Sequence, residues 1–296
     1  MLKHLSYSSL SLFWQCPEAF RLRYCGPKPP NTTNSALLTG VATHEAVAAC
    51  AKQHMADPAL EFPATYIDDL VLQCVSKHWD GFRPGDKELT LPFEILKSAV
   101  VRDASRAARY YVQNELPNRR PIAVETAFEL THPSWPIPVV GRLDLVEKDL
   151  VCDLKTSKRT PDQNAADDSD QLTLYALAYL AETNTIPAVQ LDFVVLTDRT
   201  HMLSRTSTRK MSDLQGMVER IAVTQQAILQ LLDNTQPGHA PTDKWSPALR
   251  GKWGKCKSMT CDFYKVCTMG GGVSTASLDG LKSIPTAEEI EEDVDA

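Results

Sequence analysis

The sequence predicts an α/β fold in which a helical N-terminal part precedes a set of central strands, and three observations predict it. Residues 1–120 carry apolar side chains at helical spacing, residues 121–208 alternate apolar and polar positions with many β-branched side chains, and residues 211–234 form one long amphipathic pattern. We therefore expect helices flanking a central sheet.

Each element follows from its local pattern. Two short helices are expected within residues 6–24, where Pro17 ends the first or starts the second. The remaining helical patterns cover residues 37–53, 64–80, 94–115, 171–182 and 211–234. The strand patterns cover residues 121–130, 139–146, 150–156, 189–198 and 201–208.

Composition and charge exclude several classes of protein. With 43% hydrophobic residues among 296, the chain can bury a sizeable core, and without an apolar run of about 18 residues or a secretory leader we expect a soluble, cytosolic protein with no membrane partner. The net charge is −6, but residues 279–296 hold seven acidic residues and one lysine, so residues 1–278 are neutral. The acidic balance therefore does not exclude DNA as a partner.

The strand patterns at 139–146 and 150–156 predict an antiparallel hairpin. A two-residue loop and a four-residue loop between them give the same register. In that register Asp144 lies directly opposite Asp153, with Cβ atoms roughly 4.5–5.5 Å apart. Two facing carboxylates repel each other, so this placement predicts a bound cation.

Side chains alternate along a strand, so Lys155 is expected on the face of Asp153. The opposite face is expected to be apolar and to hold Leu143, Leu145, Cys152 and Leu154. Hard oxygen ligands suit Mg²⁺ or Mn²⁺, which can activate water for phosphodiester hydrolysis while Lys155 neutralises the phosphate or orients that water. The bland alternative is a solvated hairpin with a surface Asp–Lys ion pair.

Four short motifs give the sequence a resemblance to the RecB-like branch of the PD-(D/E)XK nuclease superfamily, and they occur in that branch's order. They are G-x-x-x-H at residues 40–44, G-x-x-D at 141–144, D-x-K at 153–155 and Q-x-x-x-Y at 171–175. The resemblance implies a restriction-endonuclease-like core with a mixed central sheet, flanking helices and a helical N-terminal part.

The resemblance also implies residue roles. It assigns the ligands of Mg²⁺ or Mn²⁺: His44, Asp144, Asp153 and the backbone carbonyl of Leu154. It assigns Lys155 as the catalytic lysine, with Gln171 and Tyr175 holding either the lysine or the DNA. Glu125, on the preceding strand, is an auxiliary acidic candidate of lower rank.

Four cysteines far apart in sequence resemble those of the iron-sulfur subgroup of these nucleases, which includes AddB and the CRISPR-adaptation exonucleases. They are Cys16, Cys256, Cys261 and Cys267. The resemblance implies a [4Fe-4S] cluster that joins the two ends of the chain, although the four residues between Cys256 and Cys261 exceed the two that the subgroup commonly has. A zinc site with four thiolates is the alternative, and no metal is the third.

The other cysteines and histidines are interpreted as structural. Cys25, Cys50, Cys74 and Cys152 are expected to be small apolar fillers. Apart from His44, no histidine is expected to have partners at metal-ligand spacing, and this group includes His78.

Single-stranded DNA is the expected partner. Trp245, Arg250, Lys252, Trp253, Lys255 and Lys257 interleave aromatic and basic side chains, as a stacking platform for bases does, and Arg205, Arg209 and Lys210 could extend it. Both tryptophans could instead pack around the cysteine site. The resemblance implies a DNA exonuclease in recombination, repair, phage replication or CRISPR adaptation, in a bacterial, archaeal or phage-infected host cytosol. The alternative is a non-catalytic nucleic-acid-binding or assembly subunit of the same fold.

These expectations divide the chain into four parts. They are a helical N-terminal part with the first cluster cysteine and His44 (1–120), a catalytic core (121–243), a cysteine segment (244–268) and an acidic tail expected to be disordered (269–296).

Overall fold

The computed structural model describes residues 2–25, 34–82, 88, 90–233 and 263. The chain forms two compact units, Met1–Ala248 and Leu249–Ala296. Of the second unit only Phe263 is described, so the architecture that follows is that of the first.

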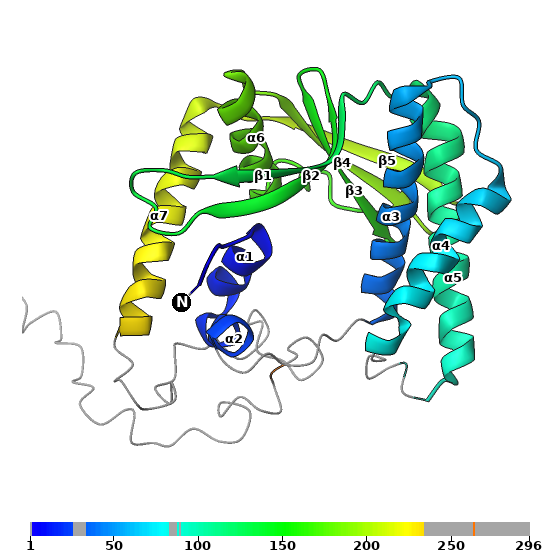
Figure 1. Ribbon diagram of the computed structural model, residues 1–296, viewed down its shortest axis with the longest axis horizontal. Helices are drawn as coiled ribbons and strands as arrows, with labels where there is room; N and C mark the ends of the chain where they lie inside the picture. Colours follow the sequence, from blue (N-terminus) through cyan, green and yellow to red (C-terminus); the bar gives the residue numbers. More distant parts are fainter. Residues whose placement is uncertain (1, 26–33, 83–87, 89, 234–262, 264–296) are drawn as a thin grey trace, which may run out of the picture. The chain divides into compact units, whose positions relative to one another are not determined.

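A mixed five-stranded sheet forms the centre of the first unit (Figure 1). Its strands are β1 (Ala123–Leu130), β2 (Val139–Glu147), β3 (Leu150–Ser157), β4 (Ala188–Val195) and β5 (His201–Thr208), in spatial order β1-β2-β3-β4-β5. β3 and β4 are parallel, and the other neighbouring pairs are antiparallel. The parallel pair needs a crossover, and helix α6 (Asp170–Thr183) provides it.

The remaining helices are α1 (Tyr7–Gln15), α2 (Pro17–Phe20), α3 (Ser35–Ala56), α4 (Ala64–His78), α5 (Phe93–Tyr110) and α7 (Met211–Asp233). Short π- or 3-10-helical turns extend three of them: η1 (Arg21–Cys25), η2 (Trp79–Gly81), and the consecutive η3 (Tyr111–Glu115) and η4 (Leu116–Asn118). The predicted order of helices and strands is therefore confirmed.

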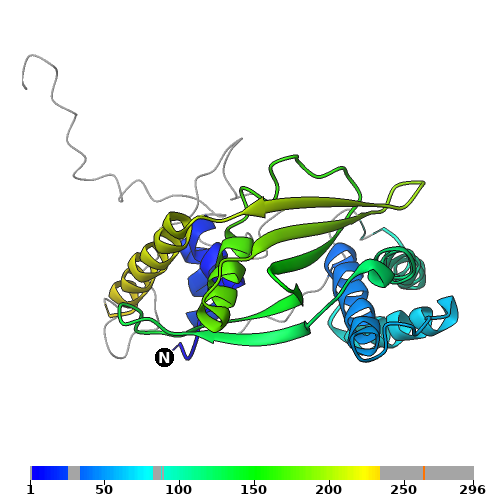
Figure 2. The same cartoon turned by 90° about the horizontal axis from the view of Figure 1, so that it is seen from above.

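Two hydrophobic clusters cover the two faces of the sheet. The first joins α1, α2, α6 and α7 to strand residues such as Val151 and Val189, and the second joins α3, α4 and α5 to strand residues such as Leu154 and Val194. Figures 1 and 2 show α3–α5 gathered on one side of the sheet, apart from α1, α6 and α7. Each face of the sheet thus packs against a helix group, which is typical of a sheet flanked by helices.

Helix α1 is fixed against α7 by one tryptophan. The indole N–H of Trp14 donates a 2.8 Å hydrogen bond to Oγ1 of Thr224, and the guanidinium of Arg220 lies 3.7 Å from the Trp14 ring centre. Helices α1 and α2 therefore pack in the hydrophobic cluster that also holds α6, α7 and residues from one face of the sheet.

Two capping features define the ends of α6. Ser169 caps its N-terminus by accepting a 3.2 Å hydrogen bond from the backbone N–H of Leu172, and Asn184 ends the helix in a left-handed conformation, with φ of 58°. In the part of the chain that the structure describes, no helix is long and apolar enough to cross a bilayer.

Candidate active site

The β2–β3 hairpin has the predicted register over the pairs that form its ladder. Leu145 pairs with Cys152, and Glu147 pairs with Leu150 across the two-residue turn. The ladder ends at Leu145–Cys152, so Asp144 and Asp153, which the same register would bring together next, are not paired through their backbones. Instead, the carboxylate of Asp144 accepts a 3.0 Å hydrogen bond from the backbone N–H of Leu154.

The sheet also opens on the other side of Asp144. The β1–β2 ladder pairs Val124 with Leu145 and Thr126 with Leu143 but skips the pair between them, Glu125 and Asp144. Glu125 has a φ of 54°, a left-handed backbone conformation that residues other than glycine rarely adopt. Asp144 is therefore released from regular pairing with both neighbouring strands.

Three side chains that can bind a metal ion, each from a different element, meet at this opening. Nδ1 of His44, on α3, lies 3.3 Å from Oδ2 of Asp144. Ligand atoms of His44, Asp144 and Glu125 all lie within 4.8 Å of one another. They line a small pocket of about 20 Å³, which is room for one water molecule or one ion.

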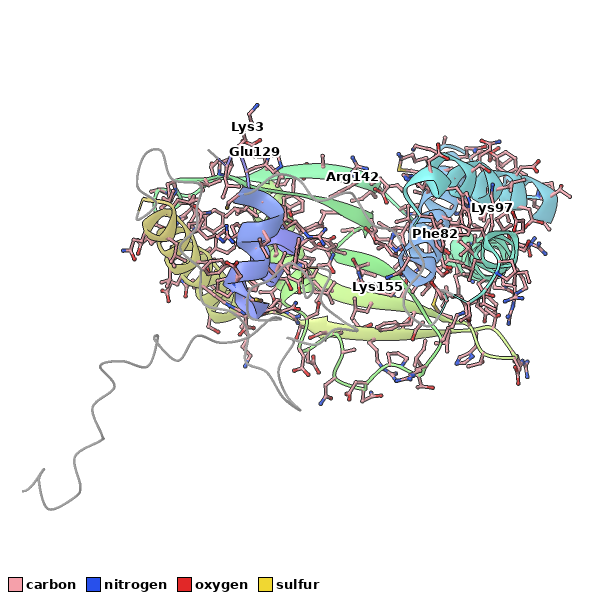
Figure 3. The ribbon with its side chains drawn as sticks, turned by 90° about the horizontal axis from the view of Figure 1, so that it is seen from below. Lys3, Phe82, Lys97, Glu129, Arg142 and Lys155 are labelled. Carbon is pink, nitrogen blue, oxygen red and sulfur yellow. The ribbon has the colours of Figure 1, made fainter. Side chains whose placement is uncertain are left out.

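Asp153 and Lys155 form the second half of the site, on β3. Oδ2 of Asp153 lies 2.8 Å from Nζ of Lys155, and the Asp153 side chain is 1% exposed, whereas that of Lys155 is 37% exposed. Within the described residues, Oδ2 of Asp153 has no partner besides this ion pair, so a buried carboxylate oxygen keeps an unused acceptor position. Figure 3 shows Lys155 between helices α3–α5 on one side and helices α1 and α7 on the other, with Arg142 on a neighbouring strand.

The two carboxyl groups titrate abnormally because they are buried close together. Burial, and then the negative charge of Asp153, raise the pKa of Asp144 to about 6, against the lowering influence of His44. Burial also raises the pKa of Asp153, although Lys155 opposes this. Without a bound cation, the site therefore favours the protonated acids more than water does.

Gln171 and Tyr175 bind the lysine side of the site from α6. Nζ of Lys155 donates a 3.2 Å hydrogen bond to Oε1 of Gln171, and Nε2 of Gln171 donates a 2.8 Å hydrogen bond to the hydroxyl of Tyr175. The sequence left open whether this pair would hold the lysine or the DNA. In the structure Gln171 holds Lys155, and Tyr175 in turn holds Gln171.

Gly141 has a role that the sequence did not reveal. A Cβ atom at this position would lie 2.4 Å from Cζ of Phe128, on β1, which is impossible without displacement. The Phe128 ring packs edge-on against Tyr175, with ring centres 6.1 Å apart. The glycine of the G-x-x-D motif thus makes room for the ring that supports Tyr175.

The expected division of the hairpin into one apolar and one charged face is wrong. Leu143 belongs to the cluster with α6 and α7, whereas Leu154 belongs to the cluster with α3–α5. Asp144 contacts His44 of α3, while Asp153 contacts the lysine that reaches α6. The reason is that helices cover both faces of this sheet and regular pairing is interrupted at Asp144.

Some other expectations are also resolved. Cys50 is buried in apolar surroundings as expected. Cys152 is buried too, but its sulfur accepts a 3.6 Å hydrogen bond from the guanidinium of Arg119, so its surroundings are not purely apolar. Cys74 lies beside Glu45 and His78, so the expectation that His78 lacks metal-ligand partners is wrong. The expectation that Arg209 could extend the DNA-binding platform is wrong, because its side chain is not exposed. Its guanidinium is buried and donates hydrogen bonds to the backbone carbonyls of Ala166 and Ser169.

The predicted cysteine site falls largely outside the described residues. Cys16 caps the N-terminus of α2, where its sulfur accepts a hydrogen bond from the backbone N–H of Ala19. Cys256, Cys261 and Cys267 lie outside the described residues, as do the Trp–Lys platform and the acidic tail.

The chemistry of the donor set fits a divalent ion. His44, Glu125 and Asp144 offer one nitrogen and two carboxylates around a pocket of about one ion's volume, and Asp153 adds a buried carboxylate with an unused acceptor position nearby. Oxygen-rich sets of this kind suit Mg²⁺ or Mn²⁺. A cation there would also relieve the repulsion that raises the pKa of Asp144.

The chain is similar to two solved structures and to one family model. In the crystal structure of a candidate exonuclease from Eubacterium rectale, the similarity covers 97% of this chain and 92% of that one, at 12% identity and a TM-score of 0.46. In the crystal structure of SSO0001, the similarity covers 78% of this chain and 93% of that one, at 12% identity and a TM-score of 0.28. Both TM-scores lie below 0.5, so neither likeness bears on function. No curated protein matches the chain. The model of the PD-(D/E)XK nuclease superfamily matches residues 4–268, and the chain therefore belongs to that superfamily.

Proposed function

We propose that the chain is a Mg²⁺- or Mn²⁺-dependent DNA exonuclease of the RecB-like type, acting on single-stranded ends. One observation carries the proposal: Asp153 is a buried carboxylate with an unused acceptor position, and it lies beside a lysine held by a dedicated helix. A surface hairpin with an ordinary ion pair would not bury its carboxylate. Superfamily membership supports a nucleic acid as the substrate.

The residues divide into two groups by role. Asp144, Asp153 and His44 would hold the ion, with Glu125 as a further ligand on β1 and the carbonyl of Leu154 as the remaining candidate. The bound ion would supply a water of lowered pKa and positive charge beside the scissile phosphate. This assignment adds Glu125 to the ligands that the sequence predicts.

Lys155 is the group that would contact the phosphate or the attacking water. Its ammonium is partly exposed, so it can reach a bound DNA strand while its ion pair with Asp153 and its hydrogen bond to Gln171 fix its direction. A fixed ammonium stabilises negative charge that develops on the phosphate in the transition state without reorganising. Gln171 and Tyr175 act through Lys155 and are positioning residues.

The test is DNA cleavage by matched pairs of variants. Labelled single-stranded and double-stranded DNA are incubated with Mg²⁺ or Mn²⁺ and the full chain. Asp153→Asn and Lys155→Gln should each lower the cleavage rate by at least about a thousandfold. Asp149→Asn and Lys148→Gln make the same chemical changes at the exposed turn of the same hairpin and should cleave as the wild type does.

Two outcomes would contradict the proposal. If the chain binds DNA but does not cut it with either metal, and Asp153→Asn binds equally well, the chain is a non-catalytic binding subunit. If cleavage is seen and survives in both Asp153→Asn and Lys155→Gln, the nuclease centre lies elsewhere.

The cysteine site belongs to the same proposal. Cys16, Cys256, Cys261 and Cys267 would bind a [4Fe-4S] cluster with a structural role. The full chain, purified without oxygen, should then have a broad visible absorbance that dithionite bleaches and that Cys16→Ser lacks. A colourless protein with stoichiometric zinc lost on Cys16→Ser would assign the four cysteines to zinc instead.

A further inference from the structure

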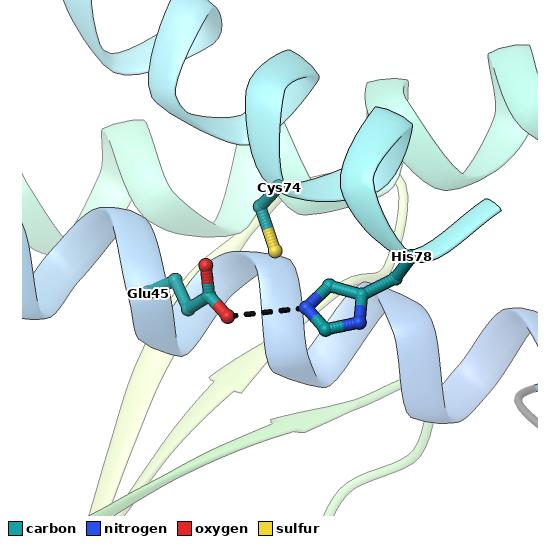
Figure 4. A group of neighbouring side chains, drawn as sticks. All are labelled: Glu45, Cys74 and His78. Atoms are coloured by element: carbon teal, nitrogen blue, oxygen red, sulfur yellow. Dashed lines mark hydrogen bonds and ion pairs between the residues drawn. The ribbon is translucent and has the colours of Figure 1, made fainter. Parts of the chain in front are cut away.

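A second group of metal-ligand side chains lies between α3 and α4, on residues that the nuclease site does not use. Glu45 on α3 faces Cys74 and His78 on α4, and their ligand atoms all lie within 4.8 Å of one another (Figure 4). Cys74 and His78 are four residues apart, so both project from the same face of α4. The group contains a sulfur, a nitrogen and an oxygen donor.

The distance between two of these ligand atoms matches the ligand shell of a zinc ion. Two ligands bound at about 2.1 Å to a tetrahedral ion lie about 3.4 Å apart. In the structure Nε2 of His78 lies 3.3 Å from Oε1 of Glu45. The sulfur of Cys74 lies within 4.8 Å of ligand atoms of both residues.

The chemical types of the donors select the class of ion. Thiolate and imidazole favour Zn²⁺ and similar transition-metal ions, whereas Mg²⁺ and Mn²⁺ favour oxygen ligands. Cys74 and His78 therefore distinguish this group from the carboxylate-rich set around Asp144. The two sites would take different ions from the same solution.

We infer that Glu45, Cys74 and His78 form a zinc-class metal site that joins α3 to α4, with water as the fourth ligand. The inference does not depend on nuclease activity.

Access and charge at the group agree with a reversible site. The side chain of Glu45 is 45% exposed and that of His78 is 37% exposed, so an ion can enter from solvent. Cys74 is buried at the inner end of the group. The ammonium of Lys77 lies 3.7 Å from Oε1 of Glu45, and it competes with a metal ion for this carboxylate.

Binding must displace one proton. Burial and the Glu45 carboxylate raise the pKa of the Cys74 thiol to about 12, so without metal Cys74 holds its proton. On binding, the S–H bond breaks, the sulfur electron pair goes to the ion and the proton goes to solvent. No oxidant or other reactant is needed.

The site would act as a structural clamp close to the nuclease centre. Glu45 directly follows His44 on α3, so an ion that ties Glu45 to α4 also fixes the helix that carries His44. A cross-link between two helices of one cluster stabilises the folded chain by the free energy of ion binding.

The first experiment measures metal content and affinity. The full chain is stripped with a chelator and titrated with Zn²⁺ in excess Mg²⁺. Glu45→Gln and His78→Ala should each lose one equivalent of zinc per chain, or bind it at least about tenfold more weakly. Both variants keep the other cysteines and all the ligands of the nuclease site, so the loss of one equivalent relative to wild type reports on the proposed site.

The second experiment identifies the sulfur ligand with Co²⁺ as the probe. A thiolate-to-cobalt charge-transfer band should appear in wild type and lose the contribution of one thiolate in Cys74→Ala. Cys50→Ala is the matched control, because Cys50 is buried in the same hydrophobic cluster and has no part in the group. It should keep the full wild-type band.

Lys77→Ala separates a metal site from a simple ion-pair group. Removing the competing ammonium should keep the zinc equivalent and tighten its binding. His78→Ala, at the next residue in the chain, should lose that equivalent or bind it more weakly. Equal zinc content and equal cobalt spectra in wild type, Glu45→Gln, His78→Ala and Cys74→Ala would overturn the inference. His78 is partly exposed, so its replacement should leave the fold intact, and zinc loss in His78→Ala would then reflect the lost ligand.

Discussion

Lys155 and Gln171 are joined by a 3.2 Å hydrogen bond that links the strand carrying Asp153 to the helix that crosses over to β4. The bond uses the oxygen of the Gln171 amide, and its nitrogen is occupied by Tyr175. The Q-x-x-x-Y motif therefore supports Lys155 through two successive hydrogen bonds. One joins the buried Tyr175 to Gln171, and the other joins Gln171 to the partly exposed Lys155 side chain.

Gln171→Ala should lower kcat of DNA cleavage about ten- to a hundredfold and leave KM nearly unchanged, because Lys155 loses the acceptor that fixes its direction. Gln171→Glu keeps an oxygen acceptor and should restore most of the rate. Gln215→Ala, at an exposed position of α7, is the matched control. A rise in KM with unchanged kcat would instead make Gln171 a DNA-binding residue.

Asp153→Asn should abolish cleavage and yet leave the metal-free protein at least as stable as the wild type. Burial raises the pKa of the Asp153 carboxyl group in spite of its ion pair with Lys155, so the folded metal-free chain disfavours the charge and its removal should cost no stability. Urea unfolding in the presence of a chelator measures this difference. A variant less stable than the wild type by more than about 1 kcal/mol would show that Asp153 is needed for folding.

The hairpin could be predicted because its information is local. Strand alternation and a short loop determine the register, and the ladder confirms it through Leu145–Cys152. The break at Asp144 could not be predicted, because it depends on the left-handed backbone of Glu125 on another strand and on His44 from α3. A regular alternation would have placed Leu143 and Leu154 on one face, which the structure contradicts.

Contacts between elements far apart in the chain also could not be predicted from the sequence. The four-residue spacing of Cys74 and His78 is visible in the chain, but only packing of α3 against α4 brings Glu45 to them. Likewise, the Q-x-x-x-Y spacing places Gln171 and Tyr175 on one face of a helix, and only the packing of α6 on β3 shows that this face meets Lys155.

The metal-free protein should lose stability as the pH rises from about 4 to about 6. Asp144 has an ordinary pKa of 3.8 and a folded-state pKa of about 6, so between these values the folded chain binds more protons than the unfolded chain. The free energy of unfolding then falls as pH rises, by about 1–3 kcal/mol across the window. Asp144→Asn should lack this contribution, and urea unfolding of both proteins from pH 4 to 7 in chelator measures it.

Saturating Mg²⁺ should reduce this loss of stability between pH 4 and pH 6, because the ion replaces the proton between the carboxylates. Below pH 6 the proton competes with the ion for Asp144, so apparent Mg²⁺ affinity should fall. A wild-type stability that rises from pH 4 to 6 relative to Asp144→Asn would contradict the raised pKa of this carboxyl group.

Gly141→Ala should reduce both stability and activity, because its Cβ would collide with the Phe128 ring, 2.4 Å away. Moving that ring disturbs its edge contact with Tyr175 and, through Gln171, the direction of Lys155. We expect a loss of about 1–3 kcal/mol in the free energy of unfolding, measured in urea.

The companion variants decide between crowding and a general intolerance of alanine. Gly216→Ala, on α7, meets nothing within 4 Å and should raise helix stability by up to about 1 kcal/mol. The double variant Gly141→Ala with Phe128→Leu removes the colliding ring edge and should recover stability more fully than activity, since Tyr175 still lacks its aromatic neighbour. If the double variant is no more stable than Gly141→Ala alone, the glycine is required for its backbone and not for the space that Phe128 occupies.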